Sequence, residues 1–346
     1  MKKLPLFLLA VGLANADSLL VLSKGDLTLA IVDPATLKVI ARMPSGPDPH
    51  EVIASADGKT AYISNYGGGA YNTITVVDLV AHRTTGTIDL GALRGPHGLW
   101  FAGGKVWFTA EAAKVIGSYD PATNRIDLVL GTGQNRTHMV WATADAKRLI
   151  TSDVSSATMT IIDKSAGGRG RGPGGPPPPG GPQQGRGAGG PPPFNPNGDW
   201  DETHVAVGPG AEGFDVAPGD KELWAANAGD GTISILDLTA RKVSATLQAG
   251  VQSANRLKIT PDGKMALVSM LANPDVAVFD EATRKLVKRI PVGHGAAGIE
   301  ITPDGSRAFV ACTPDSYVVT IDLRSLTNTG KFDAGKNPDG MAWVRH

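Results

Sequence analysis

The sequence predicts an all-β protein: a seven-bladed β-propeller of four-stranded antiparallel blades, closed by pairing N-terminal strands with the C-terminal strand. Three observations predict it. A unit of four short strands recurs along the chain, its strands alternate apolar and polar residues, and each end of the chain holds the part of a unit that the other end lacks. Blades of about 40 to 45 residues are typical of propellers, and this chain divides into seven units of about 42 residues.

The third strand of each unit is the clearest, because its alternating residues end in a turn-forming Asp. Six such strands span residues 73–78, 115–120, 159–163, 233–237, 276–280 and 318–322. Asp-Gly pairs at Asp57-Gly58, Asp262-Gly263 and Asp304-Gly305 each lie between two apolar runs. Because Asp-Gly in this setting is a strong hairpin signal, we expect the first and second strands of a blade to be adjacent and antiparallel.

The two ends of the chain complete each other. Residues 19–23, 27–33 and 37–43 read as second, third and fourth strands without a first strand, whereas residues 340–344 read as a first strand alone. Joining them makes the seventh blade and removes the exposed sheet edges that an open row of blades would leave.

Residues 1–16 have the pattern of a signal peptide. Lys2 and Lys3 precede an apolar run over residues 4–13, and Ala14 and Ala16 form a small-x-small cleavage site. The run is shorter than the ~20 residues that span a bilayer. We therefore expect no transmembrane segment, a mature propeller over residues 17–346, and a periplasmic or secreted protein.

Residues 166–199 differ in composition from the rest. They contain 13 Gly and 10 Pro and almost no apolar side chains, so they cannot bury enough surface to fold. We predict a disordered Gly/Pro-rich insertion within blade 3, between its third and fourth strands. Its Arg-Gly pattern is compatible with a polyanion or a partner, but a solvated loop explains it as well.

Charge and cysteine content exclude several classes of protein. The chain has 33 Lys and Arg against 33 Asp and Glu, so it carries no basic excess that would indicate nucleic-acid binding. Its single cysteine, Cys312, cannot form an internal disulfide, and we expect it to be a buried apolar residue. We expect a monomer whose partner is a protein or a small-molecule ligand.

The second strands carry a family resemblance. Residues 62–65 read Tyr-Ile-Ser-Asn, with variants at 224–227, 267–270 and 309–312, and Thr-Pro-Asp-Gly occurs at 260–263 and 302–305. This pattern resembles the YVTN-type β-propeller repeat family, and the resemblance covers nearly all of the chain outside the insertion. It implies the propeller fold. The family and its relatives include surface proteins, lactonases, quinoprotein subunits and haem- or copper-binding domains, so it does not select a function.

The first strand of each blade lines the central channel of a propeller, and the residues at its start form a ring. The aligned ring residues are His50, His97, His138, Glu212, Asn255, Ala297 and Asp339. Three histidines and a glutamate on consecutive blades form a candidate site for a divalent transition metal such as Zn, Cu, Fe or Ni. The alternative is that the histidines only cap the turn before the strand. Asn255 and Asp339 are candidate ligand-binding residues.

One blade has a second resemblance. Gly95-Pro96-His97-Gly98-Leu99, followed by Trp107-Phe108-Thr109-Ala110-Glu111, resembles virginiamycin B lyase, a metal-dependent propeller enzyme that opens a cyclic depsipeptide. The resemblance implies His97 as a candidate catalytic base and Glu111 as a metal ligand. Only this blade matches, and Ala110 is extra before Glu111.

Two functions therefore remain open. The first is an exported propeller that binds a protein, peptide or small ligand at its channel mouth, with or without a metal. The second is a metal-dependent lyase, lactonase or hydrolase that acts on a cyclic ester through the channel histidines. The sequence leaves open whether the protein is an enzyme and whether it holds a cofactor.

Overall fold

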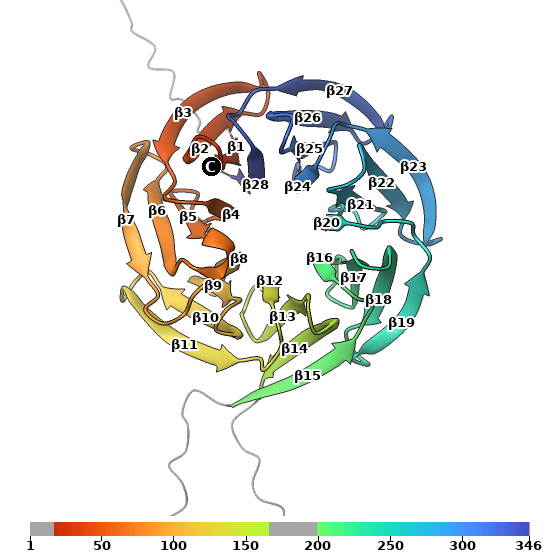
Figure 1. Cartoon of the computed structure of the whole chain (residues 1–346), viewed down its shortest axis with the longest axis horizontal. Helices are drawn as coiled ribbons and strands as arrows, with labels where there is room; N and C mark the ends of the chain where they lie inside the picture. The colour runs from red at the N-terminus through yellow and green to blue at the C-terminus, as the bar shows by residue number, and fades with distance from the viewer. Residues whose placement is uncertain (1–16, 166–198, 346) are drawn as a thin grey trace, which may run out of the picture.

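The computed structural model describes residues 17–165 and 199–345, which form a ring of seven four-stranded antiparallel sheets (Figure 1). The predicted signal peptide and all but the last residue of the predicted insertion lie outside the described residues. Among the described residues, no helix is both long and apolar enough to cross a bilayer.

The blade that joins both ends of the chain confirms the predicted closure. Its strand order is β28-β1-β2-β3, with β28 antiparallel to β1, so that Leu19 lies opposite Trp343. The bounds are β28 (Pro338–Val344), β1 (Ser18–Ser23), β2 (Thr28–Asp33) and β3 (Lys38–Pro44). Every sheet of the ring therefore has the same four-strand composition, as the repeat predicts.

The other six blades follow in chain order, each from its innermost to its outermost strand. The first three are β4 (Pro49–Ala54), β5 (Thr60–Asn65), β6 (Thr73–Asp78) and β7 (Arg83–Asp89); β8 (Pro96–Ala102), β9 (Lys105–Ala110), β10 (Val115–Asp120) and β11 (Arg125–Gly131); and β12 (Thr137–Ala142), β13 (Arg148–Asp153), β14 (Thr158–Lys164) and β15 (Trp200–Ala206). The last three are β16 (Ala211–Val216), β17 (Glu222–Asn227), β18 (Thr232–Asp237) and β19 (Lys242–Leu247); β20 (Ala254–Ile259), β21 (Met265–Met270), β22 (Asp275–Asp280) and β23 (Lys285–Pro291); and β24 (Ala296–Ile301), β25 (Arg307–Cys312), β26 (Tyr317–Asp322) and β27 (Thr327–Phe332). A 3₁₀ turn, η1 (Gly67–Gly69), lies between β5 and β6.

The turns have the chemistry that the sequence indicates. The Asp that ends a third strand accepts bonds from the turn that follows: Asp78 binds the N–H groups of Val80 and Ala81 at 3.0 and 2.9 Å. In the first hairpin of a blade, Gly58 has φ +68°, a left-handed conformation that glycine adopts without steric cost. Residues 55–59 link β4 to β5, so this hairpin loop is longer than a two-residue turn.

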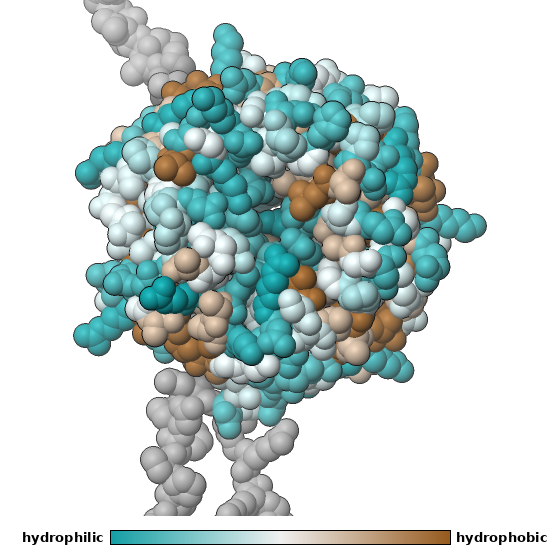
Figure 2. All heavy atoms as spheres, viewed as in Figure 1, coloured by the Kyte–Doolittle hydropathy of each residue, from teal (hydrophilic) through white to brown (hydrophobic). Residues whose placement is uncertain are grey.

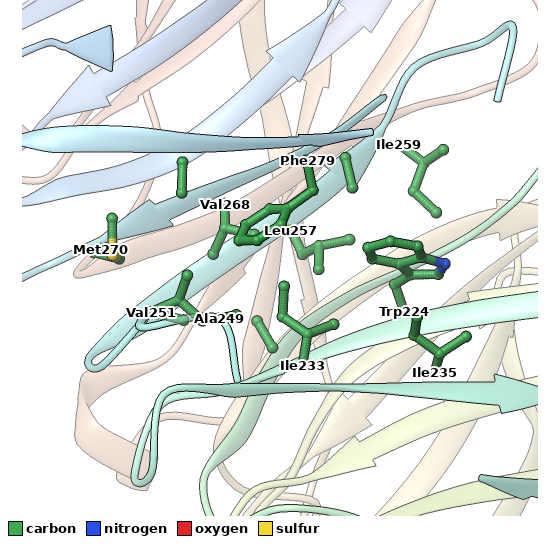
Figure 3. Packing of buried hydrophobic residues seen from close by; sticks show 14 of the residues in the cluster. Trp224, Ile233, Ile235, Ala249, Val251, Leu257, Ile259, Val268, Met270 and Phe279 are labelled. Atoms are coloured by element: carbon green, nitrogen blue, oxygen red, sulfur yellow. The ribbon is translucent and has the colours of Figure 1, made fainter. Parts of the chain in front are cut away.

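Apolar side chains fill the space between neighbouring blades. Figure 3 shows one such cluster, where Trp224 and Ile235 of one blade lie against Leu257 and Phe279 of the next. Trp224 is fully buried, and its indole N–H donates to Glu222 at 2.7 Å. Burial of a large apolar side chain contributes about 1.5–3 kcal/mol, so these contacts hold the ring together and fix its central channel.

Three polar residues share the last position of a second strand and are fully buried: Asn65, Asp153 and Asn227. Asn65 donates to the backbone oxygen of Ser45 at 3.0 Å, and Asp153 accepts the hydroxyl of Thr160 at 2.6 Å. This position therefore has a structural role, because its buried side chains form hydrogen bonds to other parts of the chain. Cys312 at the same position is fully buried, and burial raises the pKa of its thiol to about 12, as expected for an inert apolar residue.

Candidate metal centre

The innermost strands share a local distortion at the ring position. In β4, Pro49 pairs with Asn65 and Val52 with Ile63, so the ladder shifts register around His50 and Glu51. β8, β12, β16, β20 and β24 have the same shift. A bulge bends the strand and re-aims the side chains that leave the ladder. It therefore turns the ring residues towards the channel mouth, which we call the histidine mouth.

Hydroxyl groups fix the bulges and join each blade to the next. Ser64 on β5 accepts the N–H of Glu51 at 3.1 Å and donates to the backbone oxygen of His97 at 2.8 Å. Thr109 on β9 does the same for Gly98 and for the oxygen of His138, at 2.9 and 2.5 Å. These bonds satisfy backbone groups that the bulge leaves unpaired. They also hold neighbouring histidines at a set separation.

The three predicted histidines lie together. The ring centroids of His50 and His97 are 4.2 Å apart, and those of His97 and His138 are 3.7 Å apart. His97 and His138 are each 1% exposed, whereas the side chain of His50 is 18% exposed. The structure therefore brings together the three histidines that share one repeat position on consecutive blades. Tyr66, which follows β5, lies about equally close to His50 and His97.

Glu111 reaches this cluster from the end of β9. One of its carboxylate oxygens binds Nδ1 of His138, and the other accepts the hydroxyl of Tyr66. Burial alone would raise the pKa of Glu111, but the bonds from His138 and Tyr66 and the charge of Arg136 hold it below its usual value. The resemblance that implied Glu111 therefore named a residue that the structure places beside the histidines.

Glu212 and Arg136 complete this side of the mouth. Oε1 of Glu212 lies 3.5 Å from Nε2 of His138, and Arg136 lies 3.4 Å from Glu111 and 3.9 Å from Glu212. Burial opposes the charged form of His138, but the two carboxylates outweigh it and raise its pKa. For His97, burial and the nearby positive charges lower the pKa well below its usual value. His97 is therefore a neutral imidazole.

Lys24 occupies the other side of the mouth, where it contacts His50. Its ammonium donates to Nδ1 of His50 and lies 2.9 Å from Asp339 and 3.7 Å from Asp48. Burial lowers the pKa of His50 to about 3, against the opposing charge of Asp339. Because Nδ1 accepts this bond, the single proton of the neutral ring lies on Nε2. His50 can therefore bind a metal only if Lys24 moves away.

Each of two buried imidazoles has a ring nitrogen that makes no hydrogen bond to the described residues, although Glu212 lies 3.5 Å from the one on His138. Within the described residues, Nδ1 of His97 and Nε2 of His138 have no hydrogen-bond partner. Each of His97, Glu111 and His138 offers one ligand atom, and the three atoms lie within 4.8 Å of one another; His50, Glu51 and His97 form a second such group. Since a buried unpaired nitrogen costs free energy, the pair His97 and His138 with Glu111 is the better fit for a metal.

Of the three remaining ring positions, Ala297 is apolar, and Asn255 and Asp339 bind other side chains. Asn255 donates to Glu212 at 3.2 Å, and Asp339 forms the ion pair with Lys24. Sequence reasoning missed Lys24, Tyr66 and Arg136. Each lies in a loop next to a strand of the repeat, and only contacts between blades bring it to the histidine mouth. Sequence reasoning also missed the buried ion pair between Glu51 and Arg256, which joins β4 to β20 across the channel.

The comparisons with known proteins support the fold. Residues 219–328 match the family described as "Cytochrome D1 heme domain". That segment contains one histidine, His294, whose side chain is 80% exposed and pairs with Asp315. The matched segment therefore contains no buried histidine that could bind a haem iron. No curated protein sequence matches the chain.

Solved structures share the architecture at low sequence identity. A functionally unknown protein from Desulfotomaculum acetoxidans is 11% identical with a TM-score of 0.73, covering 95% of this chain and 99% of that one. A "putative 6-phosphogluconolactonase" from Bacteroides fragilis is 16% identical with a TM-score of 0.71, covering 96% and 99%. Hydrazine synthase from Kuenenia stuttgartiensis is 14% identical with a TM-score of 0.66, covering 85% and 89%. The chain is thus a seven-bladed propeller similar to these proteins, and the fold alone selects no function.

Proposed function

We propose that this propeller binds one divalent transition-metal ion at its histidine mouth and presents it to a small ligand there. The observation that carries the proposal is the pair of buried imidazole nitrogens, on His97 and His138, that lack hydrogen-bond partners among the described residues and lie beside Glu111. Neutral imidazole is a common ligand for zinc, copper, iron and nickel.

The bonding of His138 supports this assignment. Glu111 binds Nδ1 of His138, so that a singly protonated ring keeps its proton there and leaves Nε2 unprotonated. Metal-binding histidines usually donate their other N–H to a carboxylate or carbonyl in this way. Binding a metal would displace the second proton that the raised pKa of His138 favours. Affinity is therefore expected to rise with pH.

The charges at the mouth also favour a cation. Carboxylates outnumber cationic side chains among the described residues that surround the histidines: Asp48, Glu51, Glu111, Glu212 and Asp339 against Lys24, Arg136 and Arg256. A divalent ion would balance this excess. The mouth is hollowed and largely hydrophilic around the channel in the space-filling view of one face of the ring (Figure 2).

The test is calorimetric titration with Zn²⁺ and Co²⁺ of the mature chain and of His97→Ala and His138→Ala variants. We expect about one tight site per chain in the parent, and a loss of affinity of about 100-fold or more in each variant, since each removes a ligand. His294→Ala is the matched control, because it removes an exposed histidine that also pairs with a carboxylate. Unchanged affinity in the His97 and His138 variants would overturn the proposal.

One observation favours a second candidate function, the opening of a lactone or another cyclic ester at a metal that His138, Glu111 and Glu212 would hold without His97. In this alternative His97 is the base and not a ligand: it is buried and neutral, as a general base must be before it accepts a proton. The similarity to a "putative 6-phosphogluconolactonase" makes lactones the first substrates to assay. Metal-loaded parent protein should hydrolyse a lactone that a His97→Gln variant with full metal content does not. Equal rates in both proteins would remove His97 as the base.

A further inference from the structure

A second hollow lies farther along the channel, on the other side of the buried pair of Glu51 and Arg256. Its volume is about 320 Å³, and residues from the innermost strands of all seven blades line it. None of the three channel histidines is among its lining residues. Ligand cavities in proteins begin at about 300 Å³, so this channel cavity has the size for a small organic molecule.

The channel cavity opens away from the histidine mouth. A neighbouring hollow of about 370 Å³ shares Ala54, Glu300 and Trp343 with it and extends past them to Pro303 and Arg345. Residues 54, 301 and 344 end β4, β24 and β28, whereas the histidines lie at the starts of their strands. A ligand would therefore reach the channel cavity from the opposite face of the ring.

One wall of the channel cavity is aromatic. Trp100 on β8 and Trp141 on β12 line it, with ring centroids 6.2 Å apart and an interplanar angle of 45°. Phe214 on the next blade extends the apolar surface. Large aromatic side chains bury much ligand area at a low cost in conformational entropy. This wall therefore fits an aromatic or large apolar group.

The facing wall carries charges. Lys258 on β20 and Glu300 on β24 line the channel cavity, and these strands lie across the ring from β8 and β12 (Figure 1). Both residues are half-buried. Among the described residues, neither side chain forms an ion pair with a partner, and the ammonium of Lys258 makes no hydrogen bond. Asp215 also lies here, but its carboxylate already accepts the N–H groups of Val216 and Ile259 at 3.0 and 2.9 Å.

The raised pKa of Glu300 is consistent with a carboxylate that lacks a bound cation. Burial raises the pKa of its carboxyl group to about 7; Lys258 and a hydrogen bond from the backbone of Trp343 oppose the rise, and Asp215 adds to it. The surrounding protein therefore stabilises the carboxylate poorly, and a cationic group in the channel cavity would stabilise it. Lys258 in turn lacks an anion at hydrogen-bond distance. Two groups of opposite charge on adjacent strands thus face one apolar space.

We propose that the channel cavity binds a small zwitterion, an α-amino acid with an aromatic or large apolar side chain. Its carboxylate would bind Lys258, its ammonium would bind Glu300, and its side chain would lie against Trp100 and Trp141. A monocarboxylate would leave Glu300 without a bound cation, and a simple amine would leave Lys258 without an anion at hydrogen-bond distance. Sites with buried polar groups discriminate strongly against ligands that leave such groups unpaired.

The test compares three probes by calorimetry at about pH 8, where Glu300 is mostly ionised. The probes are L-phenylalanine, 3-phenylpropionate, which lacks the ammonium, and phenethylamine, which lacks the carboxylate. We expect L-phenylalanine to bind at least about tenfold more tightly than either analogue, since each analogue loses one charged contact worth about 1.5–3 kcal/mol. Binding should persist in a chelator, because the channel cavity contains none of the histidines.

Variants assign the contacts. Lys258→Met should lower the affinity for L-phenylalanine at least about tenfold and change that for phenethylamine little. Glu300→Gln should also lower the affinity for L-phenylalanine at least about tenfold, but it should change that for 3-phenylpropionate little. Lys264→Met is the control, because Lys264 lies exposed on a hairpin loop. Absence of binding by all three probes, or analogues that bind the parent as tightly as L-phenylalanine, would overturn the proposal even if the Lys258 variant failed to fold.

Discussion

Replacing Glu300 by Gln is expected to change how the free energy of unfolding depends on pH. The pKa of Glu300 is about 7 in the folded chain against an ordinary value of 4.5, because the carboxyl group is enclosed by protein. The folded state therefore keeps a proton that the unfolded state releases between these two values. Stability from this protonated group is fully present below about pH 4.5 and is lost as the pH rises through about 7.

The size of the effect follows from the two pKa values. A difference of about 2.5 in pKa corresponds to about 3 kcal/mol, at about 1.36 kcal/mol for each pKa unit. Because Glu300 faces the channel and water reaches it, screening lowers this to about 2–3 kcal/mol. Gln has nearly the shape of the protonated acid and does not titrate. The variant should therefore gain about 2–3 kcal/mol relative to the parent between about pH 4 and pH 8.5.

The assay is urea unfolding of both proteins across that pH range. At the lowest pH, the difference in unfolding free energy between the two proteins reflects changes in shape and hydrogen bonding. The increase of this difference with pH reflects only the shifted pKa of Glu300. A difference between parent and variant that stays constant from low to high pH would refute the reasoning. It would mean that Glu300 titrates in the folded chain as it does in the unfolded chain.

Three further perturbations test the scaffold. Arg256→Met should cost about 3–5 kcal/mol of unfolding free energy, because it leaves the buried carboxylate of Glu51 unpaired; the double variant with Glu51→Leu should recover most of the loss in a double-mutant cycle followed by urea unfolding. Trp224→Ala should cost about 3–5 kcal/mol in the same assay, since the side chain is fully buried between two blades. Removal of β28 should expose the edge of β1 and cause association that light scattering detects, whereas a monomeric, cooperatively folding product would show that closure is dispensable.

Much of the fold could be predicted from the sequence, because each blade repeats the same local signals. Alternating strands, Asp-ended third strands and Asp-Gly loops gave seven blades and their closure, all confirmed by the strand pairing. The aligned repeat also placed His50, His97 and His138 at one mouth of the channel. Equivalent positions on the innermost strands of consecutive blades lie close together, because these strands line one central channel (Figure 1).

The rest depends on long-range contacts that a repeat does not encode. Lys24 reaches His50 from the loop between β1 and β2 on the preceding blade, and Tyr66 reaches Glu111 from a loop on the neighbouring blade. The cross-channel pair of Glu51 and Arg256 depends on which side chains are long enough to meet over the ring. The only sequence signal for these contacts is that charged and aromatic residues occupy repeat positions that are small or apolar in other blades.

The measurement that tests the central claim most directly is the native metal content of the mature chain, purified without chelators and without a polyhistidine tag. Elemental analysis of the parent should find about one transition-metal ion per chain, and the folded His97→Ala, His138→Ala double variant should contain none. If neither protein holds a metal, even after incubation with Zn, Cu, Fe, Ni and Mn salts, the account of the histidine mouth as a metal centre is contradicted.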